Sequence, residues 1–209
     1  MLAEALRHVL LGSVRLLVGA HAHWLAPPPE GQCLYYANHS SHLDTLAIMA
    51  ALPRRLRENT HPVAALDYWG KNAFTRFVAE RGLDAVLVDR GGGGKSNPLE
   101  PLEALLEQGD SLVIFPEGTR GRGPIAPFKS GLYHLSRHFP ETPLIPVYID
   151  NLHRVMPKGH FLPVPVICSL RFGAPLLRRA DEDKQKFLER AREALLDLGG
   201  SSLEEEEAP

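Results

Sequence analysis

Cysteine is scarce in this sequence. The chain has only two cysteines in 209 residues. Cys33 and Cys168 are far apart, and each lies in an apolar run typical of a strand. We therefore expect two buried free thiols in a reducing compartment, and not a secreted fold that is cross-linked by disulfides.

The sequence also lacks a strong excess of charge of either sign. Its 23 basic and 25 acidic residues give a formal net charge of −2 at pH 7. The acidic run at residues 204–207 accounts for that sign, so the body of the chain is close to neutral. A nucleic-acid binder would present a strongly basic surface, and this composition argues against one.

A long uninterrupted apolar run is missing from the N-terminal region. A membrane-spanning helix needs about 20 mostly apolar residues, and Arg7, His8 and Arg15 interrupt the run here. No small-residue cleavage site typical of a signal peptide is evident either. Residues 2–24 instead show one polar and one apolar helical face. We expect an amphipathic helix over residues 1–26, packed on the protein's own core or lying in a membrane interface.

The rest of the composition favours one folded domain. With 44% hydrophobic and 23% charged residues, the chain can bury a sizeable core and is not disordered by composition. Three prolines at residues 27–29 should end the N-terminal helix, so we expect the domain to span residues 27–198. Apolar residues at helical spacing predict a surface helix over residues 181–198. Gly199 and Gly200 should stop it, leaving residues 199–209 as an acidic, disordered tail.

Strand-like and helix-like segments alternate within this domain. Apolar runs predict strands at residues 33–37, 63–66, 84–88, 111–115, 144–149 and 164–172. Helical patterns separate most of them, at residues 42–51, 72–80, 99–108 and 131–138. This order predicts an α/β fold with one mostly parallel or mixed central sheet flanked by helices.

A histidine and an aspartate follow the first of these strands. His39 and Asp44 are five positions apart in the stretch NHSSHLD at residues 38–44. In a continuous helix that spacing would turn them roughly 140° apart, so a turn must intervene for them to meet. Ser41 as the N-cap of a helix would leave His39 on the turn and Asp44 in the first helical turn. The carboxylate would then fix the imidazole tautomer, and the other ring nitrogen could take a proton from a hydroxyl.

The same residues allow two other interpretations. Ser41 and Asp44 are spaced as a capping box, in which the aspartate stabilises the helix start without any chemistry. His39, His42 and Asp44 could also ligate a metal, although no further part of a zinc signature accompanies them.

A second chemical signal follows the predicted strand at residues 111–115. The loop PEGTRGRG at residues 116–123 contains glycines and two arginines. Glycines let backbone N–H groups approach an anion, and arginine offers a planar, bidentate partner for phosphate oxygens. A solvated turn would explain this loop equally well on its own.

The run GGGGKS at residues 91–96 imitates a phosphate-binding loop. A true P-loop needs a glycine five positions before Gly94, and Asp89 stands there. Pro98 and Pro101 also fall where the helix of such a loop should begin. We interpret the glycine run as a flexible loop, and not as part of an NTPase site.

Taken together, these blocks resemble the glycerolipid acyltransferase family typified by 1-acyl-sn-glycerol-3-phosphate acyltransferase. The resemblance covers roughly residues 35–176 and includes six blocks in the family's order. They are NHSSHLD at 38–44, VLVDR at 86–90, FPEGTR at 115–120, PFKSG at 127–131, IPV at 145–147 and FGAPL at 172–176.

The resemblance implies a role for each matching residue. His39 would be the base that activates the acceptor hydroxyl, and Asp44 would orient it. The acceptor and its phosphate would be bound by a second set: Asn38, Arg90, Glu117, Gly118, Thr119, Arg120 and Lys129. Within this set, Arg90 and Arg120 would hold the phosphate, and Glu117 and Gly118 would shape the pocket.

The family's pattern also implies the reaction and its partners. The enzyme would move an acyl chain from acyl-CoA or acyl carrier protein to a lysophospholipid hydroxyl, with no metal and no bound cofactor. It would associate peripherally or monotopically with the cytoplasmic side of a membrane. Many members that act on lysophosphatidate carry a Lys-x-Glu-Leu segment, whereas residues 64–70 here read AALDYWG. That departure concerns the acceptor and leaves a non-glycerophosphate acceptor as an alternative. A second alternative is a catalytically silent lipid-binding module with the same fold and arginines, against which the presence of both His39 and Asp44 argues.

Overall fold

The structure is a computed structural model that describes residues 12, 21–41, 43–89, 97–121, 123–150 and 168–206. Its centre is a seven-stranded sheet with the order β1-β7-β6-β2-β5-β3-β4. β7 runs antiparallel to β6, and all other neighbouring strands are parallel. The predicted α/β class with a mostly parallel, mixed sheet is therefore confirmed. The strands are β1 (His21–Trp24), β2 (Leu34–Ala37), β3 (Thr60–Ala65), β4 (Val86–Val88), β5 (Ser111–Ile114), β6 (Leu144–Ile149) and β7 (Ser169–Phe172).

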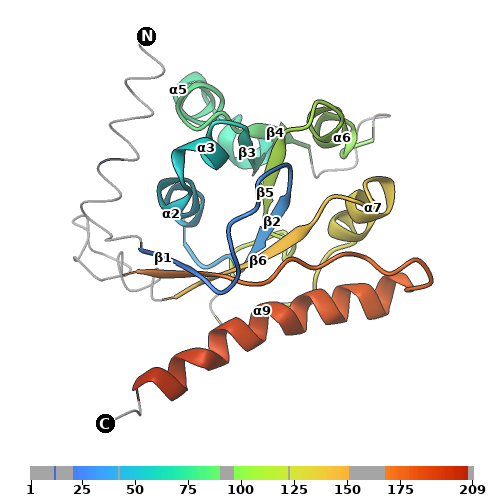
Figure 1. Ribbon diagram of the computed structural model, residues 1–209. Coiled ribbons are helices and arrows are strands. Elements are labelled where there is room, and N and C mark those ends of the chain that lie inside the picture. Colours follow the sequence, from blue (N-terminus) through green and yellow to red (C-terminus); the bar gives the residue numbers. More distant parts are fainter. Residues whose placement is uncertain are drawn as a thin grey trace.

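Helices cover both faces of the sheet (Figure 1). They are α2 (Asp44–Ala51), α3 (Arg54–Arg57), α4 (Leu66–Trp69), α5 (Ala73–Phe77), the π-helical turn η1 (Val78–Gly82), α6 (Glu100–Glu107), α7 (Gly131–His138) and α9 (Lys184–Glu206). One hydrophobic cluster packs α2 against the sheet, and a second packs α6, α7 and α9 against the opposite face. α9 accordingly lies across the sheet from α2 in Figure 1.

Strand β2 lies at the middle of this arrangement. All four of its residues are buried, as expected for a parallel strand covered on both faces. Tyr35 packs in the cluster with α2, and Tyr36 packs in the cluster with α9. The hydroxyl of Tyr36 donates a hydrogen bond to the carbonyl of Ala191 in α9 at 3.0 Å. β2 is therefore held on both faces, and the segment that follows it starts from a fixed position.

The first strand contradicts the predicted N-terminal helix over its last residues. His21–Trp24 form β1, which pairs in parallel with β7. The Trp24 ring stacks on Phe172 of β7 with centroids 4.1 Å apart. A strand-to-strand contact so distant in sequence overrides the local helical periodicity of this stretch. The domain therefore begins before residue 27, and the remainder of the predicted helix, except Gly12, lies outside the described residues.

The predicted helix stop at Gly199 is also wrong. α9 continues to Glu206. A Cβ atom on Gly199 would lie 2.7 Å from the ring of Tyr148, so the missing side chain lets α9 approach β6 closely. Glycine serves close packing here, and residues 199–206 belong to the helix that was predicted to end before them. Residues 207–209 of the predicted tail lie outside the described residues.

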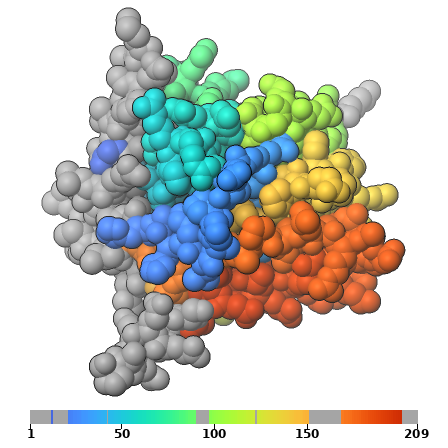
Figure 2. All heavy atoms as spheres, in the orientation of Figure 1, coloured from blue at the N-terminus to red at the C-terminus, as the bar shows by residue number. Residues whose placement is uncertain are grey.

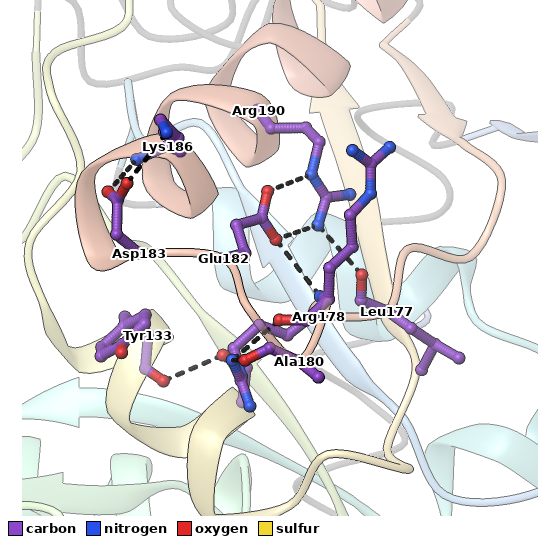
Figure 3. Close-up of polar contacts among 10 residues, drawn as sticks. Tyr133, Leu177, Arg178, Ala180, Glu182, Asp183, Lys186 and Arg190 are labelled. Carbon is purple, nitrogen blue, oxygen red and sulfur yellow. Dashed lines mark hydrogen bonds and ion pairs between the residues drawn. The ribbon is translucent and has the colours of Figure 1, made fainter.

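The start of α9 is anchored by charged side chains (Figure 3). Glu182 accepts a hydrogen bond from Arg190 Nε at 2.6 Å, and Arg190 also donates to the carbonyl of Leu177. The hydrogen bond from Arg190 lowers the pKa of Glu182. Asp183 accepts from the backbone N–H of Lys186 at 3.0 Å, as a helix-capping residue does. These contacts fix where α9 begins on the sheet.

The two cysteines are buried and free, as the sequence predicts. Burial raises the pKa of the Cys33 thiol to about 11 and that of Cys168 to about 12. Both thiols therefore remain protonated at neutral pH and are poor nucleophiles.

Candidate active site

Strands β2, β5 and β6 run in the same direction, so their carboxyl ends meet at one edge of the sheet. Asn38 directly follows β2 and fixes the chain there. Its side-chain N–H donates to the carbonyl of Ile149 at 3.0 Å, and its side-chain oxygen accepts from the Ile149 N–H at 2.8 Å. Asn38 therefore ties the end of β2 to the end of β6. The predicted substrate contact of Asn38 gains no support from this geometry, because both ends of its amide are already engaged.

His39 and Asp44 meet as predicted. Asp44 is completely buried, and its Oδ2 atom lies 2.8 Å from Nδ1 of His39. The same oxygen accepts the backbone N–H groups of Ser40 at 2.7 Å and Ser41 at 2.8 Å. Because a carboxylate can only accept, it selects the tautomer with the proton on Nδ1. The second ring nitrogen is then the basic one.

The helix start differs from the predicted one in detail. The N-cap of α2 is Leu43, and Asp44 is the first helical residue. Ser41 lies in the preceding turn, where its hydroxyl accepts the Leu43 N–H at 3.2 Å. The capping contact thus comes from Asp44, which reaches back to the turn. The same atom, Oδ2 of Asp44, accepts the turn amides and the imidazole N–H. A structural role and an orienting role of this carboxylate are therefore compatible.

The loop after β5 holds His39 from the other side. The Phe115 ring stacks on the imidazole with centroids 4.2 Å apart and an interplanar angle of 21°. The backbone N–H of His39 donates to Oε1 of Glu117 at 2.8 Å, and its carbonyl accepts from Gly121 at 2.9 Å. Oε2 of Glu117 accepts the N–H of Ala126 at 2.9 Å. Two motifs far apart in the sequence therefore form one unit around His39.

Glu117 is buried, and each of its two carboxylate oxygens accepts a backbone hydrogen bond. Its replacement should therefore lower both turnover and stability. We expect Glu117→Gln to lower turnover by about 10-fold to 100-fold and the free energy of unfolding by about 1–3 kcal/mol. The cause is that an amide NH₂ would face a backbone N–H where a carboxylate oxygen now accepts. Turnover assays and thermal unfolding measure the two effects. The exposed Glu141→Gln is the control, and equal behaviour of the two variants would contradict this role.

A cavity of about 350 Å³ lies beside His39. It forms where β3 leaves β5: β3 pairs with β5 over its first three residues and with β4 over its last three. Its apolar lining includes Val63, Ala64, Ala65, Trp69, Val88, Leu99, Leu102, Ile114, Phe115, Leu132 and Leu135. Its polar lining includes His39, Thr45, Asp67, Tyr68, Lys71, Thr119, Arg120 and Lys129. A lining with both apolar and cationic side chains matches an amphiphile with an anionic head and an apolar chain.

The loop residues predicted to bind substrate mostly line this cavity. Gly118, Thr119, Arg120 and Lys129 all do so, whereas Glu117 supports the wall from behind. Gly118 has φ of +76°, and a Cβ atom there would lie 3.3 Å from Cγ of Lys129. Glycine is therefore required both for the backbone conformation and for the approach of the lysine.

Two cavity residues were missed by the sequence analysis. The ring of Tyr68 has the Arg120 guanidinium 5.3 Å and the Lys71 ammonium 5.7 Å from its centroid. Both distances are within the range of a cation–π interaction. Lys71 follows α4 and belongs to no recognised block. In the sequence, Lys71 stands out only as a lysine shortly after the aromatic pair Tyr68 and Trp69. Without the fold, that pattern is too weak to predict a place in the site.

Several predicted residues fall outside the described part of the chain. Arg90, His42 and the glycine run at residues 91–96 are among them. Within the described residues, no group of three or more histidine, cysteine, aspartate or glutamate side chains is placed to hold a metal ion. No helix in the same residues is both long and apolar enough to cross a bilayer.

Comparison with known proteins adds a family and a fold. The acyltransferase family model matches residues 21–150, which is more than half of the chain. The mouse 1-acyl-sn-glycerol-3-phosphate acyltransferase alpha is 33% identical over 127 residues, covering 59% of this chain and 42% of the relative. The coconut (Cocos nucifera) 1-acyl-sn-glycerol-3-phosphate acyltransferase is 25% identical over 164 residues, covering 75% and 49%. The chain thus spans less than half the length of these curated relatives.

A solved structure is similar over nearly the whole chain. The crystal structure of the 1-acyl-sn-glycerophosphate (LPA) acyltransferase PlsC from Thermotoga maritima superposes with a TM-score of 0.72. The match covers 96% of this chain and 79% of that protein, at 18% sequence identity. At that identity the similarity supports the fold.

Proposed function

This chain belongs to the acyltransferase family, and on that premise we propose that it transfers an acyl chain from a thioester to the hydroxyl of a lysophospholipid such as 1-acyl-glycerol-3-phosphate. The observation that carries the proposal is the His39–Asp44 pair at the wall of a cavity lined by both apolar and cationic side chains. The relatives named for 1-acyl-sn-glycerol-3-phosphate support the choice of acceptor.

In the proposed reaction, the second ring nitrogen of His39 takes the proton of the acceptor hydroxyl. The oxygen attacks the thioester carbonyl and forms a tetrahedral intermediate, which collapses by breaking the carbon–sulfur bond. The protonated imidazole returns its proton to the departing thiolate. Asp44 keeps its negative charge throughout and stabilises the imidazolium that forms between the two steps. The products are an ester and a free thiol, and no metal or bound cofactor takes part.

The cationic side of the cavity would bind the acceptor phosphate. Arg120, Lys71 and Lys129 all line it, and the arginine can form two parallel hydrogen bonds to phosphate oxygens. The lysine that the family's Lys-x-Glu-Leu segment would supply is absent from residues 64–70, and Lys71 brings a positive charge to the same cavity. This arrangement favours a phosphate-bearing acceptor over an uncharged one.

Arg120→Ala should weaken acceptor binding more than chemistry. We expect KM for lysophosphatidate to rise by about 10-fold to 100-fold with kcat within about threefold, because a charge-assisted hydrogen bond is lost. Steady-state kinetics with varied acceptor measures both constants. Arg54→Ala, at an exposed arginine on α3, is the matched control. A fall in kcat with unchanged KM would contradict phosphate binding by Arg120.

The acceptor is an amphiphile that partitions into bilayers, so we place the enzyme at a membrane surface, on the cytoplasmic side. Peripheral or monotopic attachment would let the cavity draw lysolipid from the leaflet without a spanning helix. The thioester donor, acyl-CoA or acyl carrier protein, would then arrive from the aqueous side.

The proposal is tested by mass spectrometry of the products. Purified protein is incubated with acyl-CoA or acylated carrier protein and a panel of lysolipids and uncharged monoacylglycerols, and the His39→Ala protein serves as control. We expect a phosphate-bearing acceptor to gain one acyl chain only with the unmodified protein. Binding of lysolipid without turnover by any acceptor–donor pair would point to the silent lipid-binding module instead.

A further inference from the structure

Exposed aromatic side chains gather in one short segment of this fold. Among the described residues, the large hydrophobic side chains that are exposed are Leu25, Tyr68, Phe74, Phe77 and Leu177. Three of these lie within ten residues, on α4 and α5, and Phe74 is 75% exposed. α5 buries none of its residues. Single exposed apolar residues are ordinary on protein surfaces, whereas a local group of aromatic residues usually marks a binding surface.

The segment is well fixed, so this exposure is not the result of a loose chain. Asn72 caps α5 by accepting the N–H of Thr75 at 2.8 Å. The hydroxyl of Thr75 donates to the carbonyl of Trp69 at the end of α4, at 2.9 Å. These bonds hold α4 and α5 at a fixed corner. Phe74 and Phe77 are three residues apart in a helix and therefore share one face.

This surface borders the cavity. Tyr68, Trp69 and Lys71 belong to the same segment and also line the cavity beside His39. Phe74 and Phe77, which follow Lys71 by three and six residues, do not line it. The part of the chain that carries α5 protrudes at the upper edge of the molecule in Figure 2. The exposed rings and part of the cavity lining therefore belong to one short segment, so a surface that receives the rings would lie close to the cavity.

Basic side chains accompany the aromatic ones. Over residues 67–81 the charged side chains are Asp67, Lys71, Arg76, Glu80 and Arg81, so positive charge is in excess. Arg76 and Glu80 pair with each other at 2.9 Å, and both Lys71 and Arg81 are exposed. Aromatic rings beside lysine and arginine match the boundary of a bilayer, where rings enter the headgroup region and cations meet anionic lipid.

We propose that the aromatic surface of α4 and α5, formed by Tyr68, Phe74 and Phe77, docks on an anionic lipid membrane and seats the cavity mouth at the bilayer interface. The inference rests on the proposed function in one respect: docking would serve to admit lysolipid directly from the leaflet. The contact itself follows from the exposed rings and the excess of positive charge. It assigns a membrane contact to a segment far in sequence from the predicted N-terminal amphipathic helix.

Vesicle binding of the full chain tests the contact. Sedimentation with phosphatidylcholine vesicles containing 30% phosphatidylglycerol compares the unmodified protein with Phe74→Ser/Phe77→Ser. We expect the partition coefficient of the double variant to fall by about tenfold, since two rings no longer enter the interface. Leu177→Ser is the matched control, because Leu177 is 50% exposed and lies near the start of α9. It should bind within about twofold of the unmodified protein.

Two outcomes would overturn the docking proposal. One is vesicle binding by the double variant equal to that of the unmodified protein. The other is equal binding of the unmodified protein to vesicles with and without phosphatidylglycerol, which would remove the role of anionic lipid. Loss of self-association on gel filtration, with vesicle binding unchanged, would assign the rings to a protein contact.

An activity assay separates this proposal from the proposed function. The acceptor is presented either in vesicles or as a short-chain lysophosphatidate below its micellar concentration. We expect the double variant to lose most of its rate on vesicles and to keep its rate on the soluble acceptor. A similar loss on both would indicate damage to the site and contradict docking. If the unmodified protein acylates neither acceptor, the proposed function fails, while vesicle partition still decides the docking proposal.

Discussion

Replacing His39 with alanine is expected to lower kcat for acyl transfer by about 10³-fold to 10⁴-fold, which is the contribution of a well-placed general base. The imidazole lies at the cavity wall with its tautomer set by Asp44, so its second nitrogen is the one that can take a proton from a bound hydroxyl. The backbone of residue 39 keeps its bonds to Glu117 and Gly121 in the variant. Lysolipid affinity should therefore stay within about threefold of the unmodified value.

The measurement pairs single-turnover kinetics with lysolipid binding by calorimetry. His138→Ala provides a matched control, since His138 is an exposed histidine on α7 that pairs with Glu103. The control should retain normal turnover and normal binding. Near-normal turnover of His39→Ala would show that another group removes the proton. A parallel loss of binding and turnover would show that the histidine mainly shapes the cavity.

The local part of the site could be predicted because it is encoded over a few residues. His39 and Asp44 are separated by one turn and a helix start, and both depend on nearest-neighbour geometry. The prediction that residues 116–123 bind phosphate also rests on residue types alone. The contacts of Glu117 could not be predicted in the same way. They join residues 39 and 126, which the fold alone brings together.

Long-range strand pairing explains most of the errors in the predicted fold. β1 has only four residues, and it exists because β7, almost 150 positions later, offers it a partner. Nothing in its own sequence pattern distinguishes it from the helical periodicity of the sequence before it. Gly199 is the opposite case. Its local signal is a helix stop, but contact with Tyr148 makes a residue without a side chain favourable inside the helix.

The cationic residues of the cavity also come from distant parts of the chain, so local sequence patterns could not predict that they lie together. Lys71 and Arg120 are 49 positions apart, and the fold brings both within cation–π distance of the Tyr68 ring. A motif search finds Arg120 in its block and passes over Lys71. Asn38 shows the converse, because a residue inside a recognised block proves to join two strands through Ile149. A residue in a recognised block therefore lies in or beside the candidate site, but its place in the block does not by itself predict that it contacts the substrate.

Asp44→Asn should lower kcat by about 10²-fold to 10⁴-fold. One oxygen, Oδ2, accepts from the imidazole and from both turn amides, so an asparagine must place there either a neutral oxygen or an NH₂ group, which cannot accept. The negative charge that stabilises the imidazolium is lost in both cases, and the preferred tautomer is lost as well where the NH₂ faces the ring. The free energy of unfolding should also fall, by about 1–3 kcal/mol, because the buried carboxylate now holds two turn amides as well. Kinetics and chemical denaturation measure the two losses separately.

The double variant His39→Ala/Asp44→Asn separates the chemical role of Asp44 from its capping role. If the aspartate acts on catalysis through the imidazole, its effect on kcat should disappear once His39 is absent, and the double variant should be no slower than His39→Ala. Its effect on unfolding should remain, because the turn amides of Ser40 and Ser41 still need their acceptor. If the aspartate only caps the helix, both losses should persist in the double variant. The kinetic coupling then vanishes, and the orienting role assigned to the carboxylate is wrong.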